Sequence, residues 1–222
     1  MSIIQIQHIT KVYGTKDNIC TALHDVSMEI KQGEFVSICG TSGSGKTTLF
    51  NIISGIDTNY EGHCFVDGVD IKTLSEETMA IKRRREIGII FQFFNLISFL
   101  TVEENVKLTA QLDGKEPSKE KLNQIFHILG LENKRNAFIH ELSGGQQQRV
   151  AIARVLIANT PIILADEPTG NLDSKNTQII LDIFKQMKQL GKTIVLITHD
   201  HQVANQADRI IYFKDGEIIN ES

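Results

Sequence analysis

A glycine-rich loop placed directly after a short apolar run limits the possible folds of this chain more than any other feature. The apolar run covers residues 35–39, and a helix is expected over residues 47–54, after the loop. A strand that is apolar at nearly every position is typical of a parallel sheet covered by helices on both faces. In that setting the pattern Gly-x-x-x-x-Gly-Lys-Thr predicts a phosphate-binding loop and an α/β fold. The loop consists of Gly40, Thr41, Ser42, Gly43, Ser44, Gly45, Lys46 and Thr47.

In a loop of this kind the glycines let successive backbone N–H groups point at phosphate oxygens. Lys46 is expected to reach the β and γ phosphates of a nucleotide, and the Thr47 hydroxyl is expected to bind Mg²⁺. The first turn of the following helix favours an anion, because its N–H groups are unpaired there. The alternative is a plain Gly/Ser turn, and the strand–loop–helix context that the motif requires argues against it.

Two further apolar runs are also followed by residues whose side chains can act as acids, bases or metal ligands. Residues 162–165 precede Asp166 and Glu167, and residues 193–198 precede His199. Because ligands of parallel sheets bind at the carboxyl ends of strands, these residues and the glycine-rich loop are expected at one site. Asp166 is expected to hold Mg²⁺, Glu167 to act as a general base on water, and His199 to contact the γ phosphate and position Glu167. The alternative for each is an ordinary polar residue at a strand end.

A second glycine-rich segment has neither a lysine nor a metal-binding acid beside it. It consists of Leu142, Ser143, Gly144, Gly145 and Gln146. Ser143 is placed to cap a helix that runs to about Asn159, and the glycines let a ligand approach the backbone closely. The segment therefore predicts half of an anion site, so that a working site needs two chains. The alternative is a glycine-rich cap on a surface helix.

The remaining patterns predict an antiparallel layer and a helical portion. Residues 3–9, 24–30 and 62–68 read as strands of the antiparallel layer, and residues 209–220 read as a hairpin with an Asp-Gly turn. We expect one domain over residues 1–222, with a catalytic core of residues 1–87 and 159–222 and a helical subdomain of residues 88–158.

Composition limits the partners and the setting. The formal net charge of −4 gives no basic footprint of the kind that nucleic-acid binders show, so no nucleic acid is expected as a partner. The three cysteines, Cys20, Cys39 and Cys64, have no metal-type spacing and read as reduced thiols of a cytosolic protein. No apolar run reaches the ~18 residues that a membrane-spanning helix needs, and no secretory signal is visible.

Taken together, these motifs resemble the ATP-binding cassette (ABC) ATPases. Residues 142–146 look like the signature motif of that family, and their distance from the glycine-rich loop and from the acidic pair also matches. The resemblance covers essentially the whole chain. It implies a P-loop NTPase fold with a mostly parallel core sheet, an antiparallel β layer and a helical subdomain. It also implies ATP hydrolysis with Mg²⁺ by a homodimer, in which each ATP lies between residues 40–48 of one chain and residues 143–146 of the other.

The resemblance also implies roles for residues outside these motifs. Tyr13 matches the aromatic residue that stacks on adenine, and Thr48 belongs to the nucleotide-binding loop. Gln92 matches the glutamine that couples the γ phosphate and Mg²⁺ to a transmembrane partner. Residues 171–173, which end in Asp173, match the loop that crosses the dimer to the opposite site. His199 matches the switch histidine.

Residues 167–174 narrow the resemblance to ATPases of the lipoprotein-release, macrolide-export and antimicrobial-peptide-resistance type. This implies an integral membrane permease as partner, a place at the cytoplasmic face of the cell membrane, and export or extraction of a peptide, lipoprotein or drug. One alternative is an ATPase that transmits force or signal in a cell-division or sensing complex. Others are a soluble ABC ATPase acting on DNA or ribosomes, which usually has coiled-coil insertions or two cassettes, and an unrelated kinase or GTPase.

Phe91, Phe93, Phe94 and Phe99 are concentrated in one short segment, although aromatic residues make up only 6% of the chain. An exposed apolar patch marks an interaction site, so part of this cluster is expected to form a groove for a coupling helix of the permease. The alternative is that all four rings are core. Residues 82–85 are all basic and read either as a solvated helix face or as a contact with the anionic leaflet or the partner.

Overall fold

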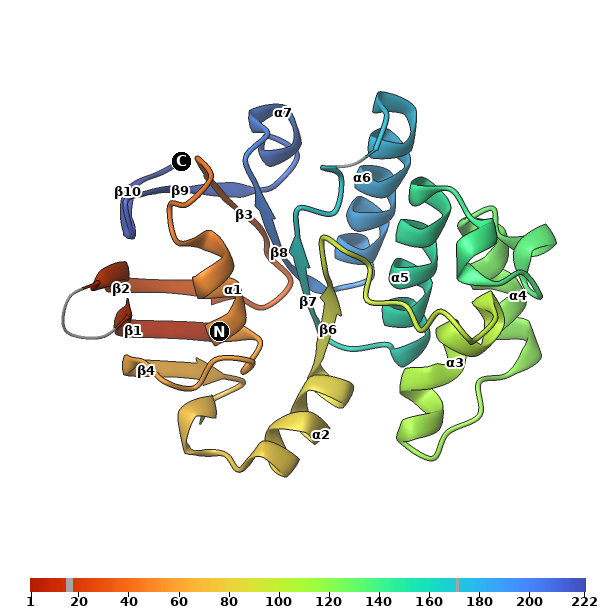
Figure 1. Ribbon diagram of the computed structural model, residues 1–222, viewed down its shortest axis with the longest axis horizontal. Helices are drawn as coiled ribbons and strands as arrows, with labels where there is room; N and C mark the ends of the chain where they lie inside the picture. Colours follow the sequence, from red (N-terminus) through yellow and green to blue (C-terminus); the bar gives the residue numbers. More distant parts are fainter. Residues whose placement is uncertain (15–17, 171) are drawn as a thin grey trace.

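The computed structural model describes residues 1–14, 18–170 and 172–222 and contains two sheets of different kinds (Figure 1). The first is antiparallel, with the order β2-β1-β4-β5. Its strands are β1 (Ser2–Tyr13), β2 (Cys20–Lys31), β4 (Glu61–Val66) and β5 (Val69–Asp70). It confirms the predicted antiparallel layer, and its first two strands are longer than the alternation of apolar residues indicates.

The second sheet has the order β10-β9-β3-β8-β7-β6. All its strands run parallel except β10, which pairs antiparallel with β9. They are β3 (Phe35–Gly40), β6 (Ile87–Ile90), β7 (Ile162–Asp166), β8 (Thr193–Thr198), β9 (Arg209–Lys214) and β10 (Glu217–Glu221). The mostly parallel core sheet is thus confirmed, and the predicted terminal hairpin forms its edge.

Helices cover both faces of the parallel sheet, which explains its continuous apolar strands. On β3, Val36 and Ile38 pack with Phe50 of helix α1 (Lys46–Ile53), between the two sheets. Phe35 points to the other face, where its ring packs edge to face with that of Phe184, with 6.3 Å between the ring centres. Phe184 belongs to α6 (Ser174–Gln189), which shares that face with α5 (Gly144–Ala158). Because both sides of β3, β7 and β8 are buried, most of their positions favour an apolar residue.

The other helices form a group remote from the antiparallel sheet and a set of short connections (Figure 1). The group consists of α3 (Val102–Leu112) and α4 (Lys119–Ile128), next to α5. The connections are η1 (Ile71–Thr73), α2 (Glu76–Glu86), η2 (Glu132–Lys134), η3 (Ile139–Glu141) and α7 (His201–Ala204). In the described part of the chain, no helix combines the length and the hydropathy that crossing a bilayer requires.

Capping residues define the helix starts. Thr101 and Glu104 form a capping box at the start of α3. Ser118 caps α4, and Asp173 caps α6. By contrast α2 has no clear sequence pattern, because only Met79 and Lys82 of this charged helix are buried. The predicted subdomain of residues 88–158 contains α3, α4 and α5, while its first residues belong to β6. Its boundaries stay a prediction.

The register of the parallel sheet brings three strand ends together. Neighbouring strands β3, β8 and β7 align Cys39 with Thr198 and Asp166 with Ile197. Their carboxyl ends therefore lie at one edge of the sheet, with β8 in the middle. The glycine-rich loop, the acidic pair and His199 all follow these ends directly, as expected from the sequence.

Candidate nucleotide site

Glycines shape the loop between β3 and α1, because the loop lies tightly against neighbouring strands. A Cβ atom on Gly40 would lie 2.2 Å from the carbonyl oxygen of Phe213 on β9. A Cβ atom on Gly45 would lie 2.4 Å from that of Ala22 on β2, and Gly45 also has a φ of +102°. Neither position accepts a side chain without displacing backbone. The loop is therefore fixed by packing from outside as well as by its own turn.

Lys46 places a cation at the centre of this loop. Its side chain is almost fully buried, and Nζ donates to the carbonyl oxygens of Gly40 at 2.8 Å and Thr41 at 2.7 Å. Nζ also lies 3.4 Å from Oγ of Ser44, which is buried beneath it. Burial lowers the pKa of Lys46, and the charges of Glu167 and Asp166 oppose that effect. A buried ammonium ringed by backbone is suited to bind a phosphate.

A cavity of about 1020 Å³ opens over the loop and contains most of the residues predicted to act there. Its lining includes Gly40, Thr41, Ser42, Gly43, Gly45, Lys46, Thr47, Thr48, Gln92, Glu167 and His199. Gln92 comes from the segment after β6, whereas the others follow β3, β7 and β8. The structure thus assembles in one place groups that are spread over more than a hundred residues of sequence.

Asp166 is the last residue of β7 and is 6% exposed; unlike Glu167, it does not line the cavity. Burial, and then the charge of Glu167, raises the pKa of Asp166 to about 6, against a hydrogen bond with Thr47 and the charge of Lys46. Its Oδ1 atom is buried and has no hydrogen-bond partner in the described residues. Mg²⁺ takes hard oxygen ligands, and a buried carboxylate oxygen without a partner beside a threonine hydroxyl fits that preference.

Glu167 follows Asp166 in a strained backbone conformation that two strands hold in place. Its φ is +45°, a left-handed value that costs a residue with a Cβ atom roughly 1–2 kcal/mol. Its N–H donates to the carbonyl oxygen of Ile197 at 2.9 Å, which fixes it to β8. Its Oε1 atom lies 2.7 Å from Nδ1 of His199, and its side chain is 13% exposed. Glu167 lines the cavity, which is consistent with its predicted role as a general base.

The second glycine-rich segment forms the exposed start of α5. Ser143 caps the helix, and Oε1 of Gln146 accepts from the Ser143 N–H at 2.9 Å, which completes a capping box. Ser143 and Gly144 are exposed. None of Ser143, Gly144, Gly145 and Gln146 lines the cavity over Lys46, and α5 packs on the opposite face of the parallel sheet from α1 (Figure 1). Within one chain, the two glycine-rich segments stay apart.

A hydrogen-bond network ties the start of α6 to α5. Asp173 accepts from the Asn176 N–H at 2.8 Å, and these contacts lower the pKa of Asp173. Arg149 on α5 donates to Oδ1 of Asn176 at 2.6 Å. The sequence did not indicate Arg149 or Asn176, since the contact joins helices that are remote in sequence. Asn171, the first residue of the loop matched by resemblance, lies outside the described residues.

Tyr13 does not line the cavity. It stands at the end of β1, where its hydroxyl donates to Oδ2 of Asp57 at 3.2 Å. Lys11 is nearly buried, forms an ion pair with Asp57 at 2.7 Å and lies 4.7 Å from the centre of the Tyr13 ring. The role of Tyr13 in binding adenine stays a prediction. No local pattern could have identified the Lys11–Asp57 pair, because its members are 46 residues apart.

The aromatic segment is divided between core and surface. Phe91 meets the edge of Phe50 at 5.9 Å, whereas Phe93 and Phe99 are 78% and 77% exposed. The alternative that all four rings are core is therefore wrong. Phe94 is half-buried.

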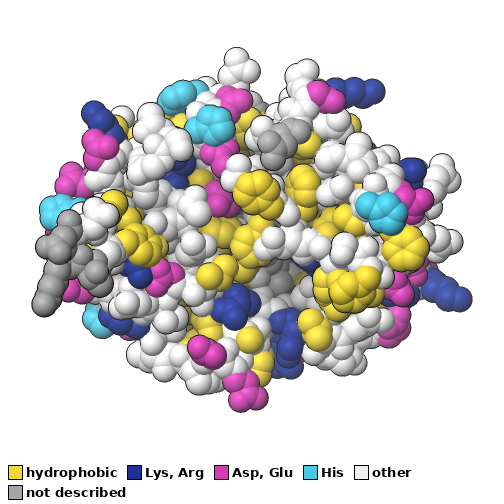
Figure 2. Space-filling view, viewed as in Figure 1, with side chains coloured by type: hydrophobic (Ala, Val, Ile, Leu, Met, Phe, Trp, Pro, Cys, Tyr) yellow, Lys and Arg dark blue, Asp and Glu magenta, His cyan; other side chains and the backbone are white. Residues whose placement is uncertain are grey.

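A separate groove of about 900 Å³ begins beside this segment. It lies between α2, β6 and α5 and includes Phe91, Leu112 and Arg154 in its lining. Figure 2 shows hydrophobic side chains gathered across the middle of this face, with Lys and Arg side chains beside them. Of the basic run on α2, Lys82 is buried against Glu86, and Arg85 pairs with Asp113 at 2.6 Å. The basic run on α2 is therefore not a fully solvated helix face.

Comparison with known proteins identifies relatives along the whole chain. A family model described as "ABC transporter" matches residues 23–170. The "Macrolide export ATP-binding/permease protein MacB" of Mannheimia succiniciproducens is 44% identical over 224 residues, which is 100% of this chain and 35% of the relative. The chain thus spans about a third of that protein. The "Uncharacterized ABC transporter ATP-binding protein MJ0796" of Methanocaldococcus jannaschii is 46% identical over 98% of this chain and 96% of its own length.

Solved structures give the same result. The dimeric structure of "a post-hydrolysis state of the ATP-binding cassette MJ0796 bound to ADP and Pi" superposes with a TM-score of 0.92 at 43% identity. That match covers 99% of this chain and 97% of the solved chain. A structure of cbiO1 from Clostridium perfringens, described as part of a transporter complex, matches with a TM-score of 0.85 at 30% identity, over 100% of this chain and 88% of that one.

Proposed function

This chain belongs to the ABC transporter family, and we propose that it is the ATP-hydrolysing subunit of a transporter and works as a head-to-tail homodimer. One observation supports the proposal: α1, which begins at Lys46, and α5, which begins after the exposed Ser143, lie on opposite faces of the sheet in one chain, although both starts are suited to bind a phosphate. A second copy supplies the missing half. The similarity to a cassette solved as a dimer with ADP and Pi supports this arrangement.

In the proposed dimer, each ATP lies between residues 40–48 of one chain and residues 143–146 of the other. The glycine-rich loop and Lys46 bind the β and γ phosphates, and the partner's Ser143 and the first N–H groups of its α5 bind the γ phosphate. Thr47, Asp166 and Gln92 would hold Mg²⁺, which neutralises charge between the β and γ oxygens when it is bound. Asp173 lies beside the opposite site, and Tyr13 stacks on adenine.

Hydrolysis needs a base in line with the γ phosphate, and Glu167 takes that role. Its carboxylate accepts a proton from the attacking water, a contribution worth about 10²–10⁴ in rate. The Nδ1 contact of His199 orients the carboxylate at 2.7 Å. A neutral imidazole that donates from Nδ1 has an acceptor at Nε2, whereas the imidazolium donates from both nitrogens. The imidazolium form of His199 can therefore hold Glu167 and a phosphate oxygen together.

The groove lined by Phe91 supplies the docking surface for a membrane partner. We infer that a short helix of an integral membrane permease occupies it, since a mostly apolar groove suits a helix and the exposed Phe93 follows Phe91 closely in the chain. MacB is described as both ATP-binding and permease protein, and this chain matches about a third of it. The proposal places this chain at the cytoplasmic face of the membrane, in export or extraction of a peptide, lipoprotein or drug.

A complementation experiment tests the composite site. Lys46→Ala disables the loop, and Ser143→Arg blocks the segment on α5, so each variant alone is expected to lose at least 90% of its ATPase activity. Mixing the two variants assembles one site from the intact loop of one chain and the intact α5 segment of the other. We expect the mixture to recover a clear fraction of parental activity. A mixture with no more activity than the sum of its parts would show that each chain contains a complete site.

A further inference from the structure

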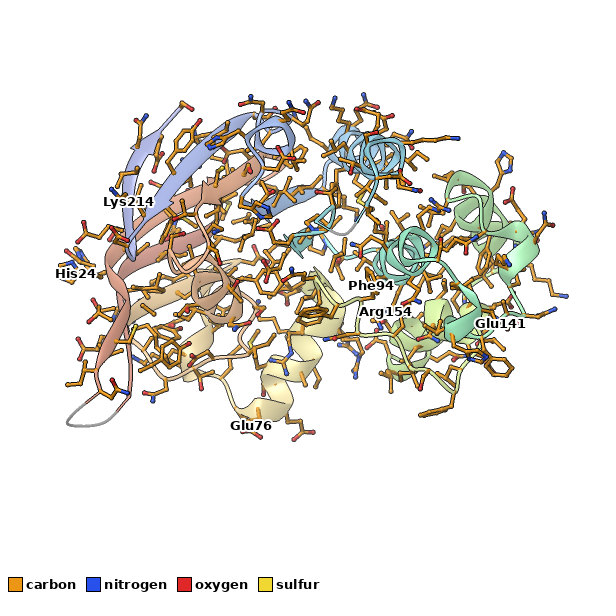
Figure 3. All side chains as sticks on the ribbon, turned by 45° about the horizontal axis from the view of Figure 1, so that its top comes forward. His24, Glu76, Phe94, Glu141, Arg154 and Lys214 are labelled. Carbon is orange, nitrogen blue, oxygen red and sulfur yellow. The ribbon has the colours of Figure 1, made fainter. Side chains whose placement is uncertain are left out.

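Arg154 is a half-buried cation in the middle of α5 that has no carboxylate within ion-pair distance among residues 1–14, 18–170 and 172–222. Its guanidinium donates to the carbonyl oxygen of Asn95 at 2.7 Å and to that of Phe94 at 3.1 Å. Arg154 and Phe94 lie side by side in Figure 3. Burial lowers the pKa of this guanidinium, which reflects the cost of keeping a charge away from water. Both bonds go to backbone atoms, so Arg154 holds a stretch of chain.

That stretch is a turn with strained backbone. Phe94 has a φ of +58° and Asn95 a φ of +47°, and a residue with a Cβ atom adopts such left-handed values at an energetic cost. Inside the turn, the Phe94 N–H donates to Phe91 at 3.2 Å, and the Asn95 N–H donates to Phe93 at 2.6 Å. No other donor in the described part of the chain reaches the Phe94 and Asn95 carbonyl oxygens. Arg154 therefore supports this turn from outside.

The position of the turn indicates the role of its contact with Arg154. It follows directly after Gln92, which lines the nucleotide cavity, and Arg154 itself lines the groove on the other side. On α5, Arg154 comes 11 residues after the cap Ser143 (154 − 143 = 11), which is about 16 Å along a helix. One helix thus joins the turn beside Gln92 to the exposed segment that completes the partner's site.

We propose that Arg154 is a positioning residue, which fixes the Phe94–Asn95 turn to α5 and thereby sets the position of Gln92. In the assembled dimer, Gln92 of one site and Ser143 of the other then move as parts of one body. The inference rests on the proposed function, because it assumes that Gln92 acts on the nucleotide of its own chain and Ser143 on that of the partner.

Two substitutions and one matched control separate positioning from simple stabilisation. Arg154→Met keeps the length and apolar contacts of the side chain and removes every donor. Arg154→Lys keeps the charge and offers a point donor in place of a planar fork. Lys121→Met is the control, because Lys121 also has a pKa lowered by burial and donates to a backbone carbonyl, that of Ile157 on α5, at 3.1 Å. Lys121 makes no hydrogen bond to the turn.

Amide hydrogen exchange in the full chain without nucleotide is the first measurement. We expect Arg154→Met to speed exchange of the Phe94 and Asn95 amides at least tenfold, and Lys121→Met to leave both rates unchanged. ATP binding without Mg²⁺ should stay within twofold of the parent, since no hydrogen bond joins Arg154 to the loop around Lys46. With Mg²⁺, kcat for Arg154→Met should fall at least tenfold, the Mg²⁺ concentration for half-maximal rate should rise, and Arg154→Lys should recover part of kcat.

Parental kcat and Mg²⁺ requirement in Arg154→Met would overturn the proposal. So would an equal loss in Lys121→Met, or a loss that follows the fall in Tm across all three variants. If the parent chain itself hydrolyses no ATP at any protein concentration, the proposed function fails. The exchange rates of Phe94 and Asn95, which need no nucleotide, then still show whether Arg154 holds the turn.

Discussion

Nδ1 of His199 and Oε1 of Glu167 lie 2.7 Å apart, although 32 residues separate them in sequence. The contact exists because β7 and β8 are neighbours in the parallel sheet and end at the same edge. It joins an exposed imidazole to a carboxylate that is largely shielded from water. Such a pair keeps the carboxylate oriented, and His199 itself lines the cavity.

Replacement of Glu167 by Gln removes the base and retains the shape of the side chain. We expect Glu167→Gln to bind ATP with parental affinity, because the loop around Lys46 is unchanged. The rate of hydrolysis should fall by at least about 10²-fold, which is the lower range for loss of a general base. The variant should accumulate as an ATP-bound dimer, measured by size-exclusion chromatography with and without ATP. Parental turnover by this variant would remove Glu167 from the mechanism.

Asp166 should make the stability of the chain depend on pH. In the folded chain the pKa of Asp166 is raised to about 6 from 3.8, because burial disfavours its charged form. The folded state therefore binds more protons than the unfolded state between these values, so the Asp166 contribution to stability falls as pH rises through this window. Above pH 6 the cost reaches roughly 3 kcal/mol at most, at 1.36 kcal/mol for each pKa unit.

Asp166→Asn removes this cost, so without Mg²⁺ the variant should be more stable than the parent at pH 8. The two should approach equal stability near pH 3, where the parental carboxyl is mostly protonated in both states. Urea unfolding at both pH values measures the difference. A stability difference independent of pH would show that Asp166 is not the buried acid that titrates. Addition of Mg²⁺ and ATP should favour the parent, because the variant has lost the anionic metal ligand.

Substitution of Gly144 distinguishes an effect on folding from an effect on the function of the dimer. It stands in the first turn of α5, is exposed, and a Cβ atom there would meet no atom within 4 Å. Gly144→Ala should therefore leave the isolated chain as stable as the parent or more stable, by up to about 1 kcal/mol. Hydrolysis should nevertheless fall about tenfold or more, because the added methyl group enters the space proposed for the partner's γ phosphate.

Gly191→Ala provides the comparison for Gly144→Ala. Gly191 also has open space around it but a φ of +81°, so alanine there should lower stability. Thermal unfolding and ATPase rates of both variants test the pair. If Gly144→Ala hydrolyses ATP at the parental rate and cooperativity, the start of α5 does not contact the nucleotide.

The exposed rings of Phe93 and Phe99 should bind the membrane partner and contribute little to folding. We expect the double substitution Phe93→Ser and Phe99→Ser to leave Tm nearly unchanged, since surface substitutions usually stay within about 0.5 kcal/mol. Recovery of an integral membrane protein with the chain from solubilised membranes should fall at least tenfold. Leu190→Ser is the control, because Leu190 is exposed to a similar extent, at 76%, and follows α6, far in sequence from Phe93 and Phe99. An equal loss in the control would place the docking surface elsewhere.

Sequence reasoning predicted those parts of the site that are local in the chain. The loop before Lys46, the acids after β7 and the cap Ser143 each lie within a few residues of the element that positions them. Helix capping, helix dipoles and apolar strands depend on residues that are close together in the chain, so the sequence alone predicts them. The α/β fold and the meeting of three strand ends at one edge followed from those patterns.

Other parts of the site depend on contacts between remote segments. Arg154 reaches a turn 59 and 60 residues away, and Lys11 pairs with Asp57 across 46 residues. A hydrogen bond specifies two facing groups, and many residues of the same type along the chain could supply either one. The sequence could not predict that Tyr13 lies outside the cavity or that Phe93 is exposed, because burial depends on what packs against a residue.

The sequence by itself determined that this chain folds as an ABC cassette and predicted an anion site at each glycine-rich segment, since both follow from short-range patterns. Only the tertiary structure decided that these segments lie apart in one chain and that Arg154 joins α5 to the turn after Gln92. The physical reason is that packing on the two faces of the sheet places α1 and α5 apart, and no local pattern encodes that arrangement.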